Sequence, residues 1–226
     1  MAVPITCIDN FYSNPDKITD FALSLKFFSA RGKDYFPGER TKCLSVVNKD
    51  FFDQSCQKLF SLFFDYNTPV NWVVTTRFQK IYPYHKDPKN LLNTGWSHLD
   101  SDHIFAGVIY LNKNPNPNSG TLLLTPNSQF SSISDSDISY RNKLYRGQKI
   151  DEKIYAKKIQ EHNNKFDISL EIKNKYNRLI CYNHNVWHRV SNFCTDEEFR
   201  LTQIFFVKEL KANSFPIQRV KDINII

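Results

Sequence analysis

The sequence predicts an α+β protein, mainly β, whose core is a β-barrel or β-sandwich. Two stretches with helical periodicity come first, at residues 15–28 and 49–63. From residue 70 onward, short runs of β-branched and aromatic residues alternate with turn residues. Helices followed by many short strands are typical of this fold class.

Length and composition predict an ordered protein with a single domain. The 226 residues are 41% hydrophobic and include 19 Phe and 11 Tyr, so we expect a single domain over residues 1–226. No apolar run reaches the roughly eighteen residues of a membrane span, and residues 1–7 lack a signal-peptide pattern. Five cysteines without a C-x-x-C pair fit reduced thiols in a cytoplasmic protein.

The net charge of +7 predicts little about partners, because the lysines are scattered and form no dense basic run. We interpret this charge as a mostly solvated surface, so nucleic acid is not the expected partner. With only 6 Gly, the chain also has no glycine-rich phosphate-binding motif.

Residues 1–69 are expected to form a helical support region. Residues 4–9 resemble a short strand, and Asn14 with Pro15 can begin the helix at 15–28. Residues 29–42 read as a loop with a turn at Pro37 and Gly38. Asp50 can cap the second helix, and its aromatic stripe is typical of a core-facing side.

Residues 70–210 are expected to hold the β core. Strands are predicted at 70–82, 104–111, 121–124, 178–182, 186–190 and 201–210, with a polar loop at 83–95. The turn-rich residues 112–120 suggest an antiparallel hairpin between 104–111 and 121–124. Residues 127–176 read as an exposed insertion, a candidate lid with a helix at 151–160, and residues 211–226 as a tail packed along the surface.

One His-x-Asp pair lies directly ahead of an apolar strand. In an extended segment, side chains at i and i+2 share a face, so His98 and Asp100 can reach one metal ion together. His188, from a distant strand, would complete a set of two imidazoles and one carboxylate. This set leaves coordination positions open and is the pattern of non-haem Fe(II) oxygenases.

Other histidines compete for this role. His85 and Asp87 repeat the His-x-Asp spacing, but prolines flank them in a loop. His103, next to Asp102, is a further alternative without the His-first order. His184 precedes His188 by four residues, a spacing that binds zinc on a helix, yet the flanking runs are strand-like.

Arg200 enters the apolar strand at 201–210. Placing its charge inward is costly unless an anion answers it, and its planar fork suits a carboxylate. Thr202 faces the same side and offers a hydroxyl donor. The alternative is a surface ion pair between Arg200 and a nearby acid, Glu197 or Glu198.

These residues resemble the Fe(II)- and 2-oxoglutarate-dependent dioxygenases, especially their prolyl-4-hydroxylase-like branch. The likeness covers about residues 70–210, and the matching motifs occur in the family's order. They are His98-Leu-Asp100, Gly107-Val-Ile-Tyr-Leu-Asn112 with Ser119-Gly-Thr121, Trp187-His-Arg-Val190 and Arg200-Leu-Thr202. The resemblance implies a double-stranded β-helix, or jelly roll, similar to cupins. It also implies that His98, Asp100 and His188 hold iron and that Arg200 and Thr202 hold 2-oxoglutarate, with a hydroxyl from Tyr110 or Tyr82.

By the same resemblance, the protein would use Fe(II), 2-oxoglutarate and O2, with ascorbate as an optional addition. It would hydroxylate a peptidyl or free amino-acid side chain and release succinate and CO2. Nucleic-acid demethylases of the superfamily carry a second arginine six residues after the first, where this chain has Phe206. Two rival interpretations are a non-catalytic jelly-roll module that binds a protein or glycan, and a cupin-type metal-dependent hydrolase or isomerase. The sequence predicts no oligomeric state.

Overall fold

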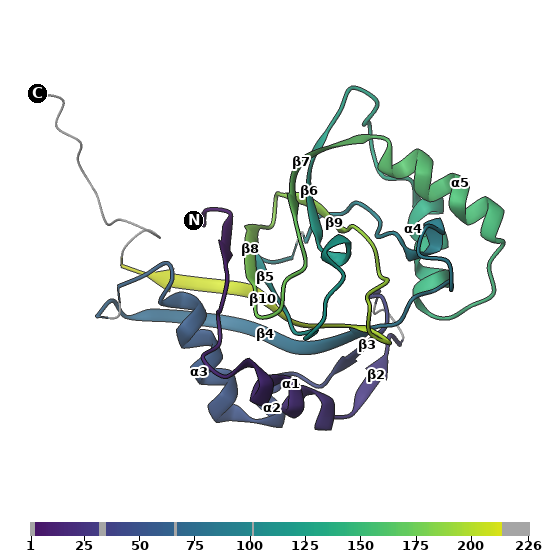
Figure 1. Cartoon of the computed structure of the whole chain (residues 1–226). Helices are drawn as coiled ribbons and strands as arrows, with labels where there is room; N and C mark the ends of the chain where they lie inside the picture. The colour runs from purple at the N-terminus through teal and green to yellow at the C-terminus, as the bar shows by residue number, and fades with distance from the viewer. Residues whose placement is uncertain (1–2, 32–34, 66, 101, 214–226) are drawn as a thin grey trace, which may run out of the picture.

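The computed structural model describes residues 3–31, 35–65, 67–100 and 102–213. Their helices and strands follow one another along the chain as β1 Thr6–Ile8, α1 Pro15–Ser24, β2 Phe27–Ser29, β3 Glu39–Thr41, α2 Leu44–Val47, α3 Lys49–Phe60, β4 Val70–Ile81, η1 Leu91–Asn93, β5 Phe105–Tyr110, η2 Pro117–Ser119, β6 Thr121–Pro126, α4 Asp135–Tyr145, α5 Glu152–Asn163, β7 Phe166–Ile172, β8 Leu179–Asn183, β9 Trp187–Val190 and β10 Arg200–Ala212 (Figure 1). Every helix among these is too short or too polar to span a bilayer.

Two antiparallel sheets face each other and form the predicted sandwich. The larger sheet has the strand order β1-β8-β5-β10-β4-β3-β2, and the smaller has the order β7-β6-β9. Ala106 and Ile180 of the larger sheet pack against Leu123 and Ile172 of the smaller one. The long β10 pairs with both β4 and β5, so it lies at the centre of the larger sheet.

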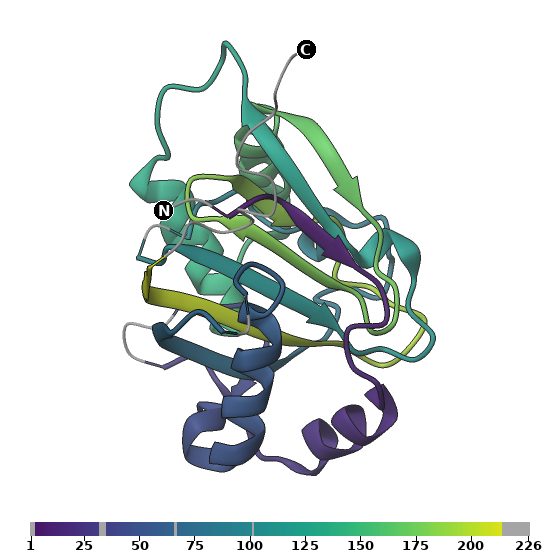
Figure 2. The ribbon, with the colours of Figure 1, turned by 90° about the vertical axis from the view of Figure 1, so that its left-hand side faces the viewer.

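The N-terminal helices cover the other face of the larger sheet (Figure 2). Phe52, Cys56 and Leu59 of α3 are buried against strand residues that include Phe78 and Phe205. Asparagine side chains cap α1 and α3: Asn14 accepts from the backbone N–H of Lys17, and Asn48 from that of Phe51. Burial of this apolar face fixes which side of β4 and β10 is left to line the space between the sheets.

The predicted hairpin between residues 104–111 and 121–124 is wrong. β5 pairs with β8 and β10 in the larger sheet, whereas β6 pairs with β7 and β9 in the smaller one. Residues 112–120 therefore cross from one sheet to the other, and η2 lies within this crossing. The turn signal was real, but a turn-rich segment does not specify whether the next strand pairs with the previous one or packs over it.

Several elements lie where the sequence predicted none. The helix expected at 15–28 ends at Ser24, because residues 27–29 pair with β3 as strand β2. Three-residue strands such as β2 and β3 are too short to show a period, so residues 29–42 read as loop. Residues 127–176 contain α4 and the edge strand β7 beside the predicted helix, which α5 confirms. Of the expected tail at 211–226, residues 214–226 lie outside the described residues.

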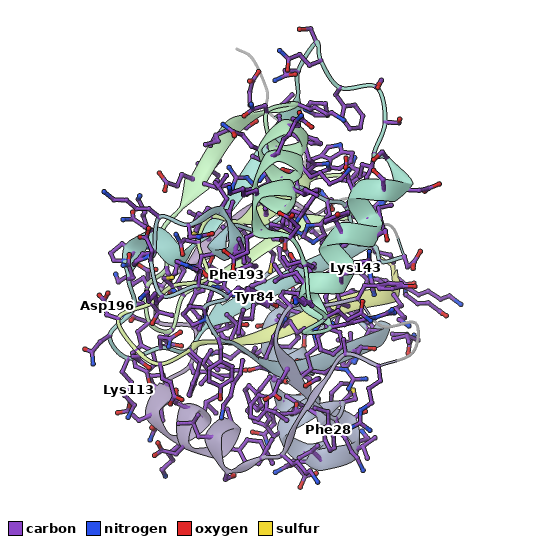
Figure 3. All side chains as sticks on the ribbon, turned by 90° about the vertical axis from the view of Figure 1, so that its right-hand side faces the viewer. Phe28, Tyr84, Lys113, Lys143, Phe193 and Asp196 are labelled. Atoms are coloured by element: carbon purple, nitrogen blue, oxygen red, sulfur yellow. The ribbon has the colours of Figure 1, made fainter. Side chains whose placement is uncertain are left out.

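The helices α4 and α5 pack beside the sandwich over the segment that precedes β5. Leu144 of α4 and Tyr155 and Ile159 of α5 form one buried cluster with Leu92 and Trp96. Beside this cluster, Tyr84 and Phe193, close together in Figure 3, place their ring centroids 5.6 Å apart. This packing ties α4 and α5, which lie between β6 and β7, to the loop that carries His98 and to the loop that follows β9.

Candidate active site

Three candidate ligand atoms converge between the two sheets. One nitrogen each from His98 and His188 and one carboxylate oxygen of Asp100 all lie within 4.8 Å of one another. The Asp100 carboxylate is 4.0 Å from Nε2 of His98 and 3.4 Å from Nε2 of His188. Chemically, two imidazoles and one carboxylate at this separation can hold a divalent metal ion on one side and leave the opposite side open.

The backbone brings the two histidines together. His98 lies outside the named strands, and it forms an isolated antiparallel bridge with His188 of β9. The N–H of each histidine donates to the carbonyl of the other at 3.0 Å. This reciprocal pair fixes residues far apart in the chain at the same level of the sandwich.

Both imidazoles have the orientation that metal binding requires. Nδ1 of His98 lies 2.8 Å from the carbonyl oxygen of Trp96, and Nδ1 of His188 lies 2.9 Å from that of Val186. A carbonyl accepts only, so each Nδ1 carries the proton and each Nε2 keeps a free lone pair. Burial and the neighbouring His188 lower the pKa of His98 to about 4, which keeps its imidazole neutral near pH 7.

Side chains of helix α5 fix residues 95–97, the segment directly before His98. The side chain of Asn163 accepts from the backbone N–H and the hydroxyl of Ser97 and donates to the carbonyl of Gly95, at 2.9–3.1 Å. His162 contacts the Ser97 carbonyl at 2.8 Å, and the indole N–H of Trp96 donates to the Tyr155 hydroxyl at 2.7 Å. Sequence reasoning missed this role, because nothing in residues 151–163 indicates their partner.

A buried arginine lies in the same cavity as the three ligand atoms. Arg200 begins β10 and is 3% exposed, and its Nε donates to the Ser119 carbonyl at 2.9 Å. No carboxylate of the described residues forms an ion pair with it, so the predicted alternative of a surface pair with Glu197 or Glu198 is wrong. Burial without an anion lowers the pKa of Arg200.

The hydroxyl of Thr202 is a second buried polar group in this cavity that lacks a partner among the described residues. Thr202 is fully buried, and its Oγ1 has no hydrogen-bond partner among the described residues. A buried cation and a buried donor on one face of β10 together fit the carboxylate of a small anion. These residues therefore suit the distal end of 2-oxoglutarate, and the convergent His98, Asp100 and His188 suit its metal.

The two predicted tyrosines lie in different places. Tyr110 is fully buried, lies beneath the Arg200 guanidinium with 5.2 Å from ring centroid to Cζ, and shares a 2.8 Å hydrogen bond with Thr121. The expectation for Tyr82 does not hold, because its ring packs against Phe199 and is 40% exposed. Ile81 faces the cavity, and the next residue along a strand points to the opposite side.

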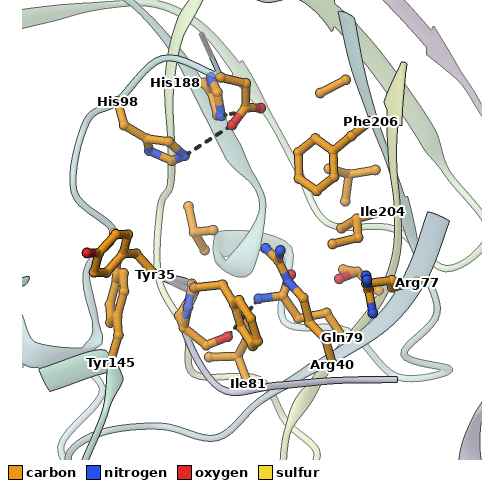
Figure 4. A pocket seen from close by; sticks show the side chains of 18 of the residues that line it. Tyr35, Arg40, Arg77, Gln79, Ile81, His98, Tyr145, His188, Ile204 and Phe206 are labelled. Atoms are coloured by element: carbon orange, nitrogen blue, oxygen red, sulfur yellow. Dashed lines mark hydrogen bonds and ion pairs between the residues drawn. The ribbon is translucent and has the colours of Figure 1, made fainter. Parts of the chain in front are cut away.

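The cavity has a volume of about 830 Å³ and is lined by residues that the sequence did not single out. The ring of Tyr182 lies 4.4 Å from that of His188 by centroids. In Figure 4, Arg40, Arg77 and Gln79 face His98 and His188 across the cavity. Arg77 carried a weaker signal in the sequence than Arg200, since its predicted strand also contains threonine, glutamine and lysine.

The rejected alternatives lie elsewhere or make other contacts. Nδ1 of His85 accepts from the backbone N–H of Asp87 in a turn, and His184 is exposed; neither lines the cavity. His103 does line it, but its ring packs 4.6 Å from that of Phe206. It is not part of the convergent group of ligand atoms.

Comparison with known proteins places the chain in a family. A family model described as a family of unknown function, DUF6445, matches residues 2–191. The chain belongs to this family. No curated protein matches this DUF6445 chain by sequence.

Solved structures show which fold the DUF6445 protein shares. HygX from Streptomyces hygroscopicus with nickel and 2-oxoglutarate bound has a TM-score of 0.54 at 8% identity, over 90% of this chain and 82% of that chain. A Trichoplax adhaerens prolyl hydroxylase in complex with a hypoxia inducible factor peptide gives 0.53 at 12% identity, over 90% and 82%. The α-ketoglutarate-dependent epimerase SnoN from nogalamycin biosynthesis gives 0.54 at 8%, over 90% and 76%. The DUF6445 chain thus has the double-stranded β-helix fold of the 2-oxoglutarate and Fe(II) oxygenases, as the sequence resemblance implied.

Proposed function

We propose that this protein is a non-haem Fe(II)- and 2-oxoglutarate-dependent dioxygenase. The proposal rests on the contents of one cavity. Three candidate metal-ligand atoms converge there, and the same cavity holds a buried arginine that forms no ion pair with a carboxylate of the described residues. A closed structural metal site would need neither the open side nor the arginine. The shared fold supports the same assignment.

Each residue has a defined task in this proposal. His98, Asp100 and His188 hold the iron, and the carbonyls of Trp96 and Val186 fix the tautomers of the two histidines. Arg200 and Thr202 bind the distal carboxylate of 2-oxoglutarate. Tyr110 supports the guanidinium from beneath and does not itself line the cavity.

When bound, iron with 2-oxoglutarate and O2 supplies the oxidation of a substrate C–H bond, with release of succinate and CO2. The protein orients both substrates and excludes water from the space between the sheets. A peptidyl or free amino-acid side chain is the substrate class that the prolyl-4-hydroxylase-like resemblance offers, and HygX and SnoN show that the fold also accommodates other substrates.

The test is an anaerobic titration of the purified protein with Fe(II) and 2-oxoglutarate, followed through the visible charge-transfer band of the chelate. We expect a band in the parent protein, its loss in His188→Ala and its weakening in Arg200→Ala. His184→Ala is the matched control, because His184 is exposed and lies four residues from His188. A parent protein without the band and without retained iron would overturn the proposal.

A further inference from the structure

The cavity carries more positive charge than 2-oxoglutarate requires. Its described lining includes five arginines and two lysines, against two aspartates, Asp100 and Asp102. In the proposed function, Asp100 is neutralised by the metal and Arg200 by the distal carboxylate. A strongly cationic cavity attracts and retains anions, because its low-dielectric walls focus the field of the charges.

Two of these arginines have no carboxylate partner in the described part of the chain. Arg77 donates from Nη1 to the Thr41 carbonyl at 2.9 Å, and Arg141 donates from Nε to the side chain of Asn142 at 3.3 Å. Neither forms an ion pair. Each is partly buried, so water solvates the unanswered charge only incompletely.

The two arginines belong to different walls of the same cavity. Arg77 lies on β4 in the larger sheet, whereas Arg141 lies on α4 beside the sandwich. Arg141 lines the same cavity as His98, Asp100 and His188, so this guanidinium shares the space beside the proposed metal. A molecule bound between the walls would therefore lie next to the open side of the three ligands.

Arg77 is separate from the subsite proposed for 2-oxoglutarate. In the register of β4 and β10, Arg200 is opposite Ile81, whereas Arg77 is opposite Ile204. Four residues along a strand correspond to about 13 Å of backbone. The guanidinium of Arg77 is held at the Thr41 carbonyl, whereas that of Arg200 is held at the Ser119 carbonyl, so the two groups are fixed in different parts of the cavity. Gln79, between them on the same face, donates to the Pro37 carbonyl at 2.7 Å. Arg77 is therefore left for the second substrate.

Aromatic rings line two sides of the cavity. Phe36 and Phe206 both lie against the guanidinium of Arg40, which lies on the strand beside β4, with ring centroids 4.2 Å and 5.5 Å from Cζ. Tyr35 and Tyr145 lie together at one side of the cavity (Figure 4). This environment suits a ligand that combines an anionic group with an apolar body.

We propose that the oxidised substrate is a small organic anion, whose carboxylate or phosphate group is bound by Arg77 on one wall and attracted by the charge of Arg141 on the other. Guanidinium forks bind both groups through paired hydrogen bonds. This inference rests on the proposed function for its reaction, but the anion site itself is independent of turnover. It excludes neutral sugars and other uncharged molecules as substrates.

Direct binding tests the site without metal or turnover. Phenyl phosphate and an N-acetylated aromatic amino acid serve as the phosphate and carboxylate probes, with phenol and the amino-acid amide as their neutral matches, in isothermal titration calorimetry. The amino-acid amide is likewise N-acetylated, so that it is uncharged. We expect binding of at least one anion over its neutral match, and at least tenfold weaker binding in Arg77→Gln and Arg141→Gln. Lys80→Gln, on β4 with its side chain against Phe27 and Phe199, and Lys143→Gln, exposed on α4, are the matched controls.

The Arg200→Gln variant separates the two subsites. Anion binding that persists in Arg200→Gln and is lost in Arg77→Gln supports the proposal; the reverse pattern assigns the probe to the 2-oxoglutarate subsite and overturns it. Absence of anion binding in the parent protein also overturns it. A parent protein that binds the anion but gives no Fe(II) and 2-oxoglutarate band would refute the proposed reaction and leave the anion site intact.

Succinate release then tests the substrate class. With Fe(II), 2-oxoglutarate and O2, we expect anionic candidates to stimulate succinate release more than their neutral matches do. In Arg77→Gln, this stimulation should fall at least tenfold, while the affinity for 2-oxoglutarate, measured from the visible band, stays unchanged. Equal stimulation by neutral matches would contradict the inference.

Discussion

The substitution Arg200→Met distinguishes an arginine that binds the cosubstrate from one that holds the fold together. Replacing a buried ionic group by an apolar side chain of similar volume is often neutral or stabilising, by about 1–4 kcal/mol. Loss of the charged hydrogen bond to Ser119 removes about 1.5–3 kcal/mol of stability. The two effects offset each other, so the free energy of unfolding of the metal-free protein should change by less than about 2 kcal/mol.

The response of stability to 2-oxoglutarate should change much more. At a concentration of 100 times its Kd, a ligand raises the free energy of unfolding by about 2.7 kcal/mol, or about 5–11 °C in Tm for a chain of this size. Loss of a paired, charge-assisted contact worth about 3 kcal/mol weakens Kd more than about 100-fold. The same 2-oxoglutarate concentration then adds only about 0.4 kcal/mol to the variant, or about 1 °C.

Differential scanning calorimetry with Zn(II) as a redox-inactive metal measures both quantities. The parent protein and Arg200→Met are compared with and without 2-oxoglutarate, and Tyr82→Phe is the control, because Tyr82 lies outside the cavity. Two results would refute the reasoning: a metal-free Arg200→Met that loses more than about 3 kcal/mol, or one that keeps the parent's ligand-induced shift.

Three further substitutions have definite expected outcomes. Thr202→Val removes a buried hydroxyl without a partner, so the free energy of unfolding of the metal-free protein, measured with urea, should rise by about 1 kcal/mol. The same substitution should weaken 2-oxoglutarate binding, and a loss of stability would contradict this prediction. Asn163→Ala removes the contacts to Ser97 and Gly95, so calorimetry should show a loss of about 2–3 kcal/mol and metal titration a higher Kd; unchanged metal affinity would argue against a positioning role. Hydrogen bonds from Arg178 and then Lys175 lower the pKa of Asp9 to about 2, so its stabilisation is present above pH 3.8 and is lost as the pH falls through 2. The Asp9→Asn deficit should therefore be about 1 kcal/mol at pH 6, because solvent screens this partly exposed pair, and should vanish near pH 2; a deficit independent of pH would exclude the ion pair as its cause.

Local sequence patterns were reliable where a short segment contains its own physical signal. The aromatic stripe at residues 49–63 and the β-branched run at 70–82 each repeat with one period, and α3 and β4 confirm both. The spacing of His98 and Asp100 and the charge of Arg200 in an apolar strand selected residues that meet in one cavity. These signals depend on side chains within a few residues of each other.

The sequence did not predict in the same way which strands pair or which side of a sheet each side chain faces. A period of two tells which residues share a face, but not which face is inside or which strand comes alongside. That is why the sequence left open Tyr82, whose ring packs against Phe199 outside the cavity, and Tyr110, which is buried beneath Arg200. It is also why residues 112–120 were interpreted as a hairpin turn when they cross between sheets.

The sequence by itself determined the fold class, the longer strands of the core and the candidate set of His98, Asp100, His188 and Arg200. Only the tertiary structure decided that β5 and β6 lie in different sheets, that α5 holds the segment of His98, and that arginines from β4 and α4 share its cavity. The reason is physical: these relations are made by contacts between side chains and backbone groups far apart in the chain. The energy of such contacts exists only once both sheets and α5 have packed together.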